Sequence, residues 1–253
     1  MGSYNNRRYE ISINDVTLDG DKYTIIETDI LNPPIPRYID ESIEGRDGII
    51  KLFDSFDNVE NSMTIMVKPN DKSNHIDEYM SDFHELLYKY PEYFTVTLKQ
   101  YKKYDNNFEE QLSCFKECYI TNIEPELIAD DTILLYLDFE SESFWNGIKN
   151  KVSQNFRNEG MDTNDYIIRV RTDANGGRIT LGNRSFRITT HGRTILLHGK
   201  NGLITDDRGQ FITDTLFEGD LPTIRRGSNG VVTSGSIDNF SIEFREKFIY
   251  PPF

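Results

Sequence analysis

Short runs of alternating apolar and polar residues recur along the first half of the chain and predict β-strands. Val, Ile, Tyr and Phe are enriched in these runs, and Gly, Asn, Asp or Pro residues separate them, as is usual for strands joined by turns. The best candidates are residues 8–13, 23–28, 62–67, 94–100, 115–123 and 132–139. This half of the chain is therefore expected to be mainly β.

One segment of the first half has helical periodicity. Its apolar positions follow the spacing of three, four and seven residues that marks one face of an amphipathic helix. Ser73 or Asn74 can cap the start, and Pro91 disfavours helical geometry at the residue before it. We expect a single helix of about four turns that packs one apolar stripe on a sheet. The stripe consists of Ile76, Tyr79, Met80, Phe83, Leu86, Leu87 and Tyr90.

The second half contains a further set of short strands with strong turn signals between them. Residues 173–177, D-A-N-G-G, are expected to form a tight reversal between two strands. Many short strands without helices favour a β-sandwich. The candidates are residues 166–172, 178–181, 185–189, 194–197, 202–205, 210–213 and 240–244.

A domain boundary is expected near Glu142. Residues 139–160 have weak periodicity and many polar side chains, and the charge balance changes there. The expected domains are therefore residues 1–141 and residues 142–253. Trp145, the one tryptophan, lies just past this boundary, where an aromatic side chain often anchors one domain against the next.

The net charge of −14 is unevenly distributed between these two parts. Residues 1–141 hold 13 Lys and Arg against 29 Asp and Glu, a net charge of −16, whereas residues 142–253 hold 15 against 13, a net charge of +2. One interpretation is an ordinary acidic surface that keeps the protein soluble. The other interpretation is that the acidic residues 1–141 form a wall that must not bind nucleic acid.

The residues that usually carry metal or nucleophilic chemistry are absent or badly spaced. Cys114 and Cys118 have no second pair to complete a zinc site, and on one strand they lie too far apart for a disulfide, so we expect free thiols. No nucleophile elbow, phosphate-binding loop or apolar run of about 20 residues is present. We expect no catalytic residue, no metal and no cofactor. The four histidines also lack ligand spacing: His75, His84, His191 and His198.

A sugar site is the main chemical alternative. Glycoside hydrolases use a pair of carboxylates, and the chain has such pairs, for example Glu140 with Glu142 and Asp206 with Asp207. The residue types alone therefore do not exclude a glycoside hydrolase. In a chain with 42 acidic residues, however, closeness in sequence carries little weight. Sugar sites also favour exposed aromatic side chains, and the second half has no Trp beyond Trp145.

The loop at residues 219–230, G-D-L-P-T-I-R-R-G-S-N-G, carries the one basic pair of note. The favoured interpretation is a structural turn, because a proline fixes φ and glycines permit tight turning. The next interpretation is contact with a partner protein. Phosphate binding is the least favoured, because no aromatic residues are interleaved with the arginines. The candidate contact residues are Asp220, Pro222, Arg225, Arg226 and Asn229.

Three segments together resemble one family. Residues 39–50, I-D-E-S-I-E-G-R-D-G-I-I, contain a turn made of Gly45, Arg46, Asp47 and Gly48. The loop at 219–230 and the R-E-K-F of residues 245–248 follow in the same order and spacing. In this order, and over nearly the whole chain length, the sequence resembles the distal tail protein (Dit) family of long, flexible-tailed phages.

The resemblance implies an all-β protein with two domains. The first, residues 1–141, would be a β-sandwich-like domain carrying one α-helix, and six copies of it would form a ring around the tail channel. The second, residues 142–253, would be a galectin-like β-sandwich that projects outward.

The implied role is a structural hub without enzymatic activity. The homo-hexamer would join the tail tube protein to the tail-tip protein and dock receptor-binding or baseplate proteins, while DNA passes through the channel without specific binding. The chain would be made in the host cytoplasm and end in the virion, with no membrane contact. The alternative is a carbohydrate-binding or glycoside-hydrolysing module of a host-adhesion device.

Overall fold

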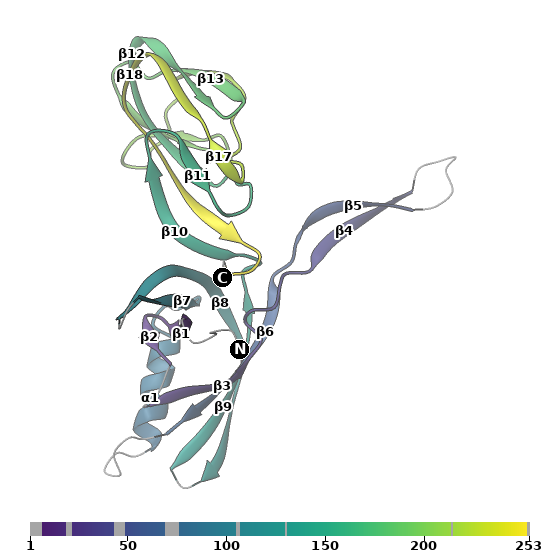
Figure 1. Cartoon of the computed structure of the whole chain (residues 1–253). Coiled ribbons are helices and arrows are strands. Elements are labelled where there is room, and N and C mark those ends of the chain that lie inside the picture. Colours follow the sequence, from purple (N-terminus) through teal and green to yellow (C-terminus); the bar gives the residue numbers. More distant parts are fainter. Residues whose placement is uncertain are drawn as a thin grey trace. The chain divides into compact units, whose positions relative to one another are not determined.

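The computed structural model describes residues 7–18, 22–42, 49–68, 76–104, 107–129, 131–213 and 215–251 (Figure 1). Strands make up most of the described residues and α1 is the one helix among them, so the predicted all-β class with a single helix is confirmed. The chain divides into two compact units. Unit 1 comprises Met1–Trp145 and Ile249–Phe253, and unit 2 comprises Asn146–Phe248.

Two sheets that share one long strand form the body of unit 1. Strand β8 pairs with β7 through its first half, as far as the Phe94–Cys118 pair, and with β9 through its second half. One sheet therefore has the order β2-β1-β7-β8 and the other the order β3-β6-β9-β8. The strands are β1 (Arg7–Ile13), β2 (Val16–Thr17), β3 (Tyr23–Thr28), β6 (Val59–Val67), β7 (Phe94–Tyr104), β8 (Asn107–Ala129) and β9 (Thr132–Ser141).

The core of unit 1 lies between these two sheets. Buried and exposed positions alternate along β6, which is the pattern of a strand with one face in the core. Phe94 of β7 and Phe139 of β9 meet edge to face, with ring centroids 5.3 Å apart. Both are almost fully buried, so this aromatic pair joins the two sheets.

The helix α1 (Ile76–Leu87) covers one end of this core, as Figure 1 shows beside β1 and β3. Phe83 packs on the Tyr23 ring at 5.0 Å between centroids, and the Asn14 side chain donates a hydrogen bond to the Leu86 carbonyl at 2.7 Å. Of the seven positions predicted for the apolar stripe, Tyr79, Phe83 and Leu87 are buried.

The helix is shorter than its apolar pattern predicted. It ends at Leu87, and Tyr90 is exposed instead of completing the stripe. The cause is local. The Asn14 side chain donates to the Leu86 carbonyl, and the Lys89 N–H donates to the same carbonyl, three residues back instead of the four of an α-helix. The expected caps, Ser73 and Asn74, lie outside the described residues.

A two-stranded arm completes unit 1 and was not predicted. Strands β4 (Pro36–Ser42) and β5 (Ile49–Phe56) pair only with each other among the described strands. Figure 1 shows this hairpin extending away from the sheets of its own unit. The predicted Gly45-Arg46-Asp47-Gly48 turn falls between the two strands and lies outside the described residues.

A lysine is buried in unit 1 between the two cysteines. Lys116 on β8 is fully buried, its Nζ donates to Ser141 Oγ at 3.3 Å, and it lies 5.3 Å from the centre of the Trp145 ring. Burial lowers the pKa of Lys116. Cys114 and Cys118 are buried and free, as predicted.

Unit 1 is expected to lose stability above about pH 9 because of these thiols. Burial raises the pKa of Cys114 to about 12 from 9.0 and raises the pKa of Cys118 further. Below pH 9 both thiols are neutral in the folded and unfolded chain; above it only the unfolded chain ionises, so each thiol lowers the unfolding free energy by up to about 1.4 kcal/mol per pH unit.

Urea unfolding between about pH 8 and about pH 10 measures this slope. Lys116 works in the opposite direction, because its lowered pKa makes the unfolded chain the better proton binder, and it is present in every sample. Replacing Cys114 and Cys118 with Ala should flatten the alkaline loss. An unchanged slope would show that the buried thiols do not cause it.

Unit 2 is built around one long, bent strand. Strand β12 pairs with β18 along one edge, and its other edge pairs with β14 in the first half and β13 in the second. Its core is a cluster of buried aliphatic and aromatic side chains that includes Val170, Ile195 and Phe244. The strands are β10 (Trp145–Val152), β11 (Phe156–Asn158), β12 (Tyr166–Leu181), β13 (Arg184–Thr189), β14 (Thr194–His198), β15 (Ile204–Thr205), β16 (Leu216–Gly219), β17 (Gly227–Asn229) and β18 (Val231–Phe248).

The predicted reversal at residues 173–177 is wrong. The strand continues through this segment as a bulge. Thr172 pairs with Ile237 and Gly177 pairs with Gly235, so an advance of five residues along β12 matches two residues along β18. A Cβ on Gly177 would lie 2.6 Å from Ile237 Cδ1, and Gly176 has φ +70°, so these glycines permit close strand contact at a bend and do not form a turn. The Asp173 carboxylate accepts the Asn175 N–H at 2.8 Å, which holds the bulge.

One further expectation for unit 2 differs from the structure. Residues 210–213 form no strand; Phe211 makes an isolated bridge to Thr205. Residues 139–160, whose periodicity in the sequence is weak, contain β10 and β11. Their polar side chains are compatible with strands because many of these positions, including Lys149 and Lys151, are exposed.

Candidate functional site: an acidic sheet face and an apolar arm in unit 1

The β3-β6-β9-β8 sheet directs acidic side chains to the face opposite the core. Alternate residues of β6 and β9 leave the buried face, as the period of a strand requires. These exposed positions hold Glu60 on β6 and Asp138 and Glu140 on β9. Exposed Glu124 and Glu126 extend the row onto β8.

No Lys or Arg offsets this charge in the strand segments that form this face. Residues 23–28, 59–67, 119–129 and 132–141 contain six Asp and Glu and no Lys or Arg. Asp29 follows β3 and accepts the Ser62 N–H at 2.6 Å. The result is a negative surface with an open hollow of about 470 Å³ that Asp29, Glu60, Asp138 and Glu140 line.

The strand register brings like charges together. Glu60 lies directly opposite Glu140, and Ser62 opposite Asp138. Like charges directly opposite each other in a sheet destabilise it, by on the order of a few tenths of a kcal/mol at an exposed site. Stability alone would favour a lysine opposite Glu140, so the uniform sign of this face indicates another use.

Hydrogen bonds hold several of these carboxylates without neutralising them. The Tyr136 hydroxyl donates to Glu126 at 2.7 Å, and this bond raises the pKa of Tyr136 because it stabilises the protonated phenol. The Asn122 amide donates to Glu124 at 3.1 Å and to Asp138 at 3.4 Å. Within the described ranges, no group of three or more His, Cys, Asp or Glu side chains could hold a metal ion.

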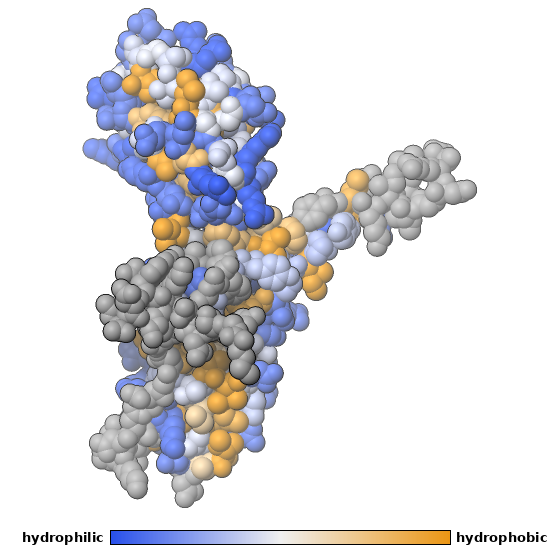
Figure 2. Space-filling view, in the orientation of Figure 1, coloured by the Kyte–Doolittle hydropathy of each residue, from blue (hydrophilic) through white to orange (hydrophobic). Residues whose placement is uncertain are grey.

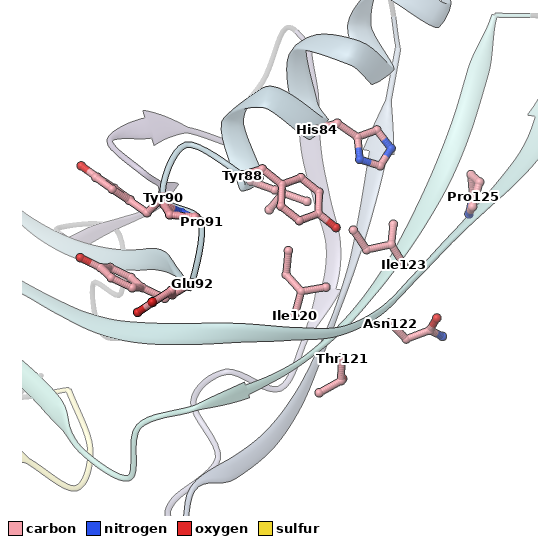
Figure 3. A pocket seen from close by; sticks show the side chains of 12 residues that line it. His84, Tyr88, Tyr90, Pro91, Glu92, Ile120, Thr121, Asn122, Ile123 and Pro125 are labelled. Atoms are coloured by element: carbon pink, nitrogen blue, oxygen red, sulfur yellow. The ribbon is translucent and has the colours of Figure 1, made fainter.

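A second hollow of about 540 Å³ lies between the end of α1 and β8 (Figure 3). It runs beside the part of β8 that continues past the start of β7. His84, Tyr88, Tyr90 and Tyr93 line it, with Tyr90 and Tyr93 stacked at 5.4 Å between ring centroids. Figure 3 shows Tyr88 above Ile120, so one wall is aromatic and the other aliphatic.

The arm exposes apolar side chains on both of its strands. Ile35 is 76% exposed just before β4, and Tyr38 and Ile39 on β4 are about half exposed. Ile39 lies opposite Leu52 of β5, which is 44% exposed. Figure 2 shows apolar side chains along the described part of the arm. An isolated two-stranded hairpin is at best marginally stable in water, so such an arm fits a contact surface.

The predicted loop at 219–230 lies in unit 2 and is well ordered by its own contacts. Pro222 is buried and its carbonyl accepts the Tyr166 hydroxyl at 2.7 Å. Asn229 is buried and its side chain bonds the backbone of Arg225 in both directions. Asp220 lies 3.5 Å from the Arg184 guanidinium. The predicted partner contact by this loop stays a prediction.

Sequence reasoning missed the acidic face, the aromatic hollow and the arm. Glu60 stands two residues before the predicted strand 62–67, and Asp138 and Glu140 alternate at the end of the predicted strand 132–139. These acids carried a signal for the face, but the pairing of β6 with β9 was needed to join them. The hollow and the arm had no recognisable motif.

No family model and no curated protein matches the chain. Among solved structures, the Dit protein of phage SPP1, described as a paradigm of hub adsorption apparatus in phages that infect Gram-positive bacteria, aligns over 95% of this chain and 99% of its own, with a TM-score of 0.67 at 14% identity. The chain therefore has the fold of SPP1 Dit.

A baseplate structure gives a weaker likeness. A chain of the phage P2 baseplate, solved in its activated conformation with Ca, aligns over 96% of this chain and 99% of its own, with a TM-score of 0.46 at 10% identity. No described helix of the chain is long and apolar enough to cross a membrane.

Proposed function

We propose that the chain is a structural hub of a phage tail. Six copies of unit 1 form a ring at the distal end of the tail, between the tail tube protein and the tail-tip protein, and receptor-binding or baseplate proteins dock on unit 2. The protein is made in the host cytoplasm and acts in the virion. The role is mechanical and involves no catalysis.

The observation that supports this proposal most is the acidic sheet face on a fold shared with SPP1 Dit. A channel that passes DNA quickly must avoid binding its phosphates, and a wall with six carboxylates and no Lys or Arg in residues 23–28, 59–67, 119–129 and 132–141 repels them. The β3-β6-β9-β8 sheet would line the channel with this face.

The arm supports the ring. Its exposed Ile35, Tyr38, Ile39 and Leu52 would pack on the neighbouring copy, since a closed ring requires each copy to present two different surfaces to its neighbours. Burial on that neighbour would also stabilise a hairpin that has no sheet of its own to join among the described strands.

Oligomeric state tests the proposal directly. Size-exclusion chromatography with light scattering of the full chain should give a discrete hexamer, and negative-stain images should show six-fold rings with a central hole. A stable monomer at every concentration, also in the presence of the tail tube protein, would overturn the proposal.

The aromatic hollow of Figure 3 favours a second candidate, a carbohydrate-binding module. The rings of Tyr88 and Tyr93 offer stacking surfaces, and Glu92 and Asn122 offer hydrogen-bond partners for hydroxyl groups. A monomer that binds a glycan, and that loses the glycan when Tyr88 is replaced with Ala, would support this candidate over the hub.

A further inference from the structure

Three arginines from two separate hairpins meet around one hollow of unit 2. The hollow has a volume of about 390 Å³ and is lined by Arg184, Arg225, Arg226, Asp162, Asn183 and Thr223. Arg184 starts β13, forty-one residues before Arg225. The sequence showed only the pair in the loop, and the structure adds the third cation.

The backbone that carries these arginines is held firmly. The N–H of Gly182, in the turn before Arg184, donates to the Gly230 carbonyl at 2.8 Å and ties the two hairpins together. The Arg225 N–H donates to Asn229 Oδ1 at 3.0 Å, and the Arg226 N–H donates to Asp162 Oδ1 at 2.7 Å. Two hydrogen bonds join Ile224 to Thr163. The side chains therefore extend from a pre-organised platform.

Two of the guanidinium groups have no counter-ion among the residues that the structure describes. Arg225 and Arg226 are exposed, and neither has a carboxylate within 4.0 Å among the described residues. Arg184 pairs only loosely with Asp220, which is itself 82% exposed. Asp162 is the one acid in the lining, and one of its oxygens already accepts a backbone N–H. Among the described residues, Asp162 and Asp220 offset only part of the charge of the three arginines, so the hollow keeps a net positive charge.

The lining points to a hydrophilic oxyanion. The planar fork of arginine fits phosphate oxygens in pairs, and a site with three such forks is suited to a phosphate group. The wall has no aromatic or aliphatic residue, whereas protein contacts usually need such anchors. The free oxygen of Asp162 and the side chains of Asn183 and Thr223 can bond hydroxyl groups beside the phosphate.

We propose that this hollow, the arginine site, binds a phosphate group carried on a polyol or sugar, such as one unit of an anionic, hydroxyl-rich polymer. Arg184, Arg225 and Arg226 hold the phosphate, and Asp162, Asn183 and Thr223 bond the hydroxyl groups. This inference does not depend on the hub or its ring, because one chain carries the whole site.

Titration calorimetry with the full chain tests the arginine site. The probes are glycerol 3-phosphate, a short poly(glycerol phosphate), inorganic phosphate and glycerol. The two phosphate-bearing polyols should bind more tightly than inorganic phosphate, and glycerol should not bind. Binding should weaken steeply as salt is raised, because the contact is mainly electrostatic.

Variants locate the binding. Replacing Arg225 and Arg226 with Ala should weaken binding by roughly tenfold or more, because charge-assisted hydrogen bonds are lost. Arg226→Lys keeps the charge but loses the fork, and should weaken binding several-fold. The matched control replaces Arg178 and Arg208, two exposed arginines of unit 2 outside the hollow, with Ala and should leave binding unchanged.

Four results would overturn the proposal. Equal loss in the Arg178/Arg208 variant would show a general charge effect. Equal affinity for inorganic phosphate and glycerol 3-phosphate would show that the polyol hydroxyl groups do not contribute to binding. Tighter binding of a Glu-rich peptide, or no binding of any phosphate probe, would assign the loop to another partner. Unfolding curves of all variants should coincide, because every replaced side chain is exposed.

Discussion

Reversing the charge of the acidic face should convert a channel that repels DNA into one that retains it. In the Asp138→Lys/Glu140→Lys variant, each copy places two cations where two carboxylates stood, and a hexamer would place twelve around the channel. With six to ten phosphates contacted, affinity for linear duplex DNA should be measurable in about 50 mM salt and fall by about 10³-fold or more by about 200 mM. Fluorescence anisotropy of a short labelled duplex measures both values, and the native chain should show no binding.

Two controls make this result specific. Glu78→Lys/Glu85→Lys places the same charge change on the exposed side of α1, off the sheet face, and should not retain DNA. A closed circular duplex cannot thread a preformed ring, so the Asp138→Lys/Glu140→Lys ring should hold linear DNA and not circular DNA. Equal binding of both forms would show that the acidic face lies outside any channel, and the charge would then serve solubility.

The strand pattern could be predicted well wherever one face of a strand is buried. Residues 23–28 were predicted to the residue, and β6, β7 and β9 were found with short ends. Strands with two exposed faces could not be found in this way, because alternation needs a core on one side. The arm is the clearest case: apolar residues on both faces of β4 and β5 give no period of two.

Other errors came from long-range contacts. The glycines at 176 and 177 have the composition of a turn, and only the close approach of Ile237 and the neighbouring strand explains why they lie in a bulge. The arginine site likewise depends on the contact between Gly182 and Gly230, which joins two segments that are distant in sequence. Local sequence shows which residues tolerate an unusual backbone and not which strands they bring together.

The structure shows where part of the negative charge of residues 1–141 lies. The sequence placed a net charge of −16 in residues 1–141 without showing where it lies. The structure concentrates part of it on one sheet face, with Glu60 opposite Glu140 and no Lys or Arg in residues 23–28, 59–67, 119–129 and 132–141. A charge spread for solubility would have no reason to exclude cations from one face while Lys22 pairs with Asp82 elsewhere in the same unit.

Placing charges on the arm should break the proposed ring into single chains. Ile39 and Leu52 lie opposite each other and are each about half exposed, so a neighbouring copy could still cover about half of each side chain. Their joint contact contributes about 2–3 kcal/mol, and Ile39→Asp/Leu52→Asp should weaken each interface roughly 30- to 150-fold, more where the carboxylates are desolvated. Light scattering across a dilution series measures the shift from hexamer to monomer.

The matched control for the arm is Ile148→Asp/Val232→Asp in unit 2. Both side chains are 63% exposed, so the change in surface charge and hydrophobicity is equal or larger, yet neither lies on the arm. This control should remain hexameric at the concentrations where the arm variant dissociates, and both variants should unfold in urea like the native monomer. A hexamer that survives the arm substitutions would separate the arm from the ring and assign its apolar side chains to a different tail protein.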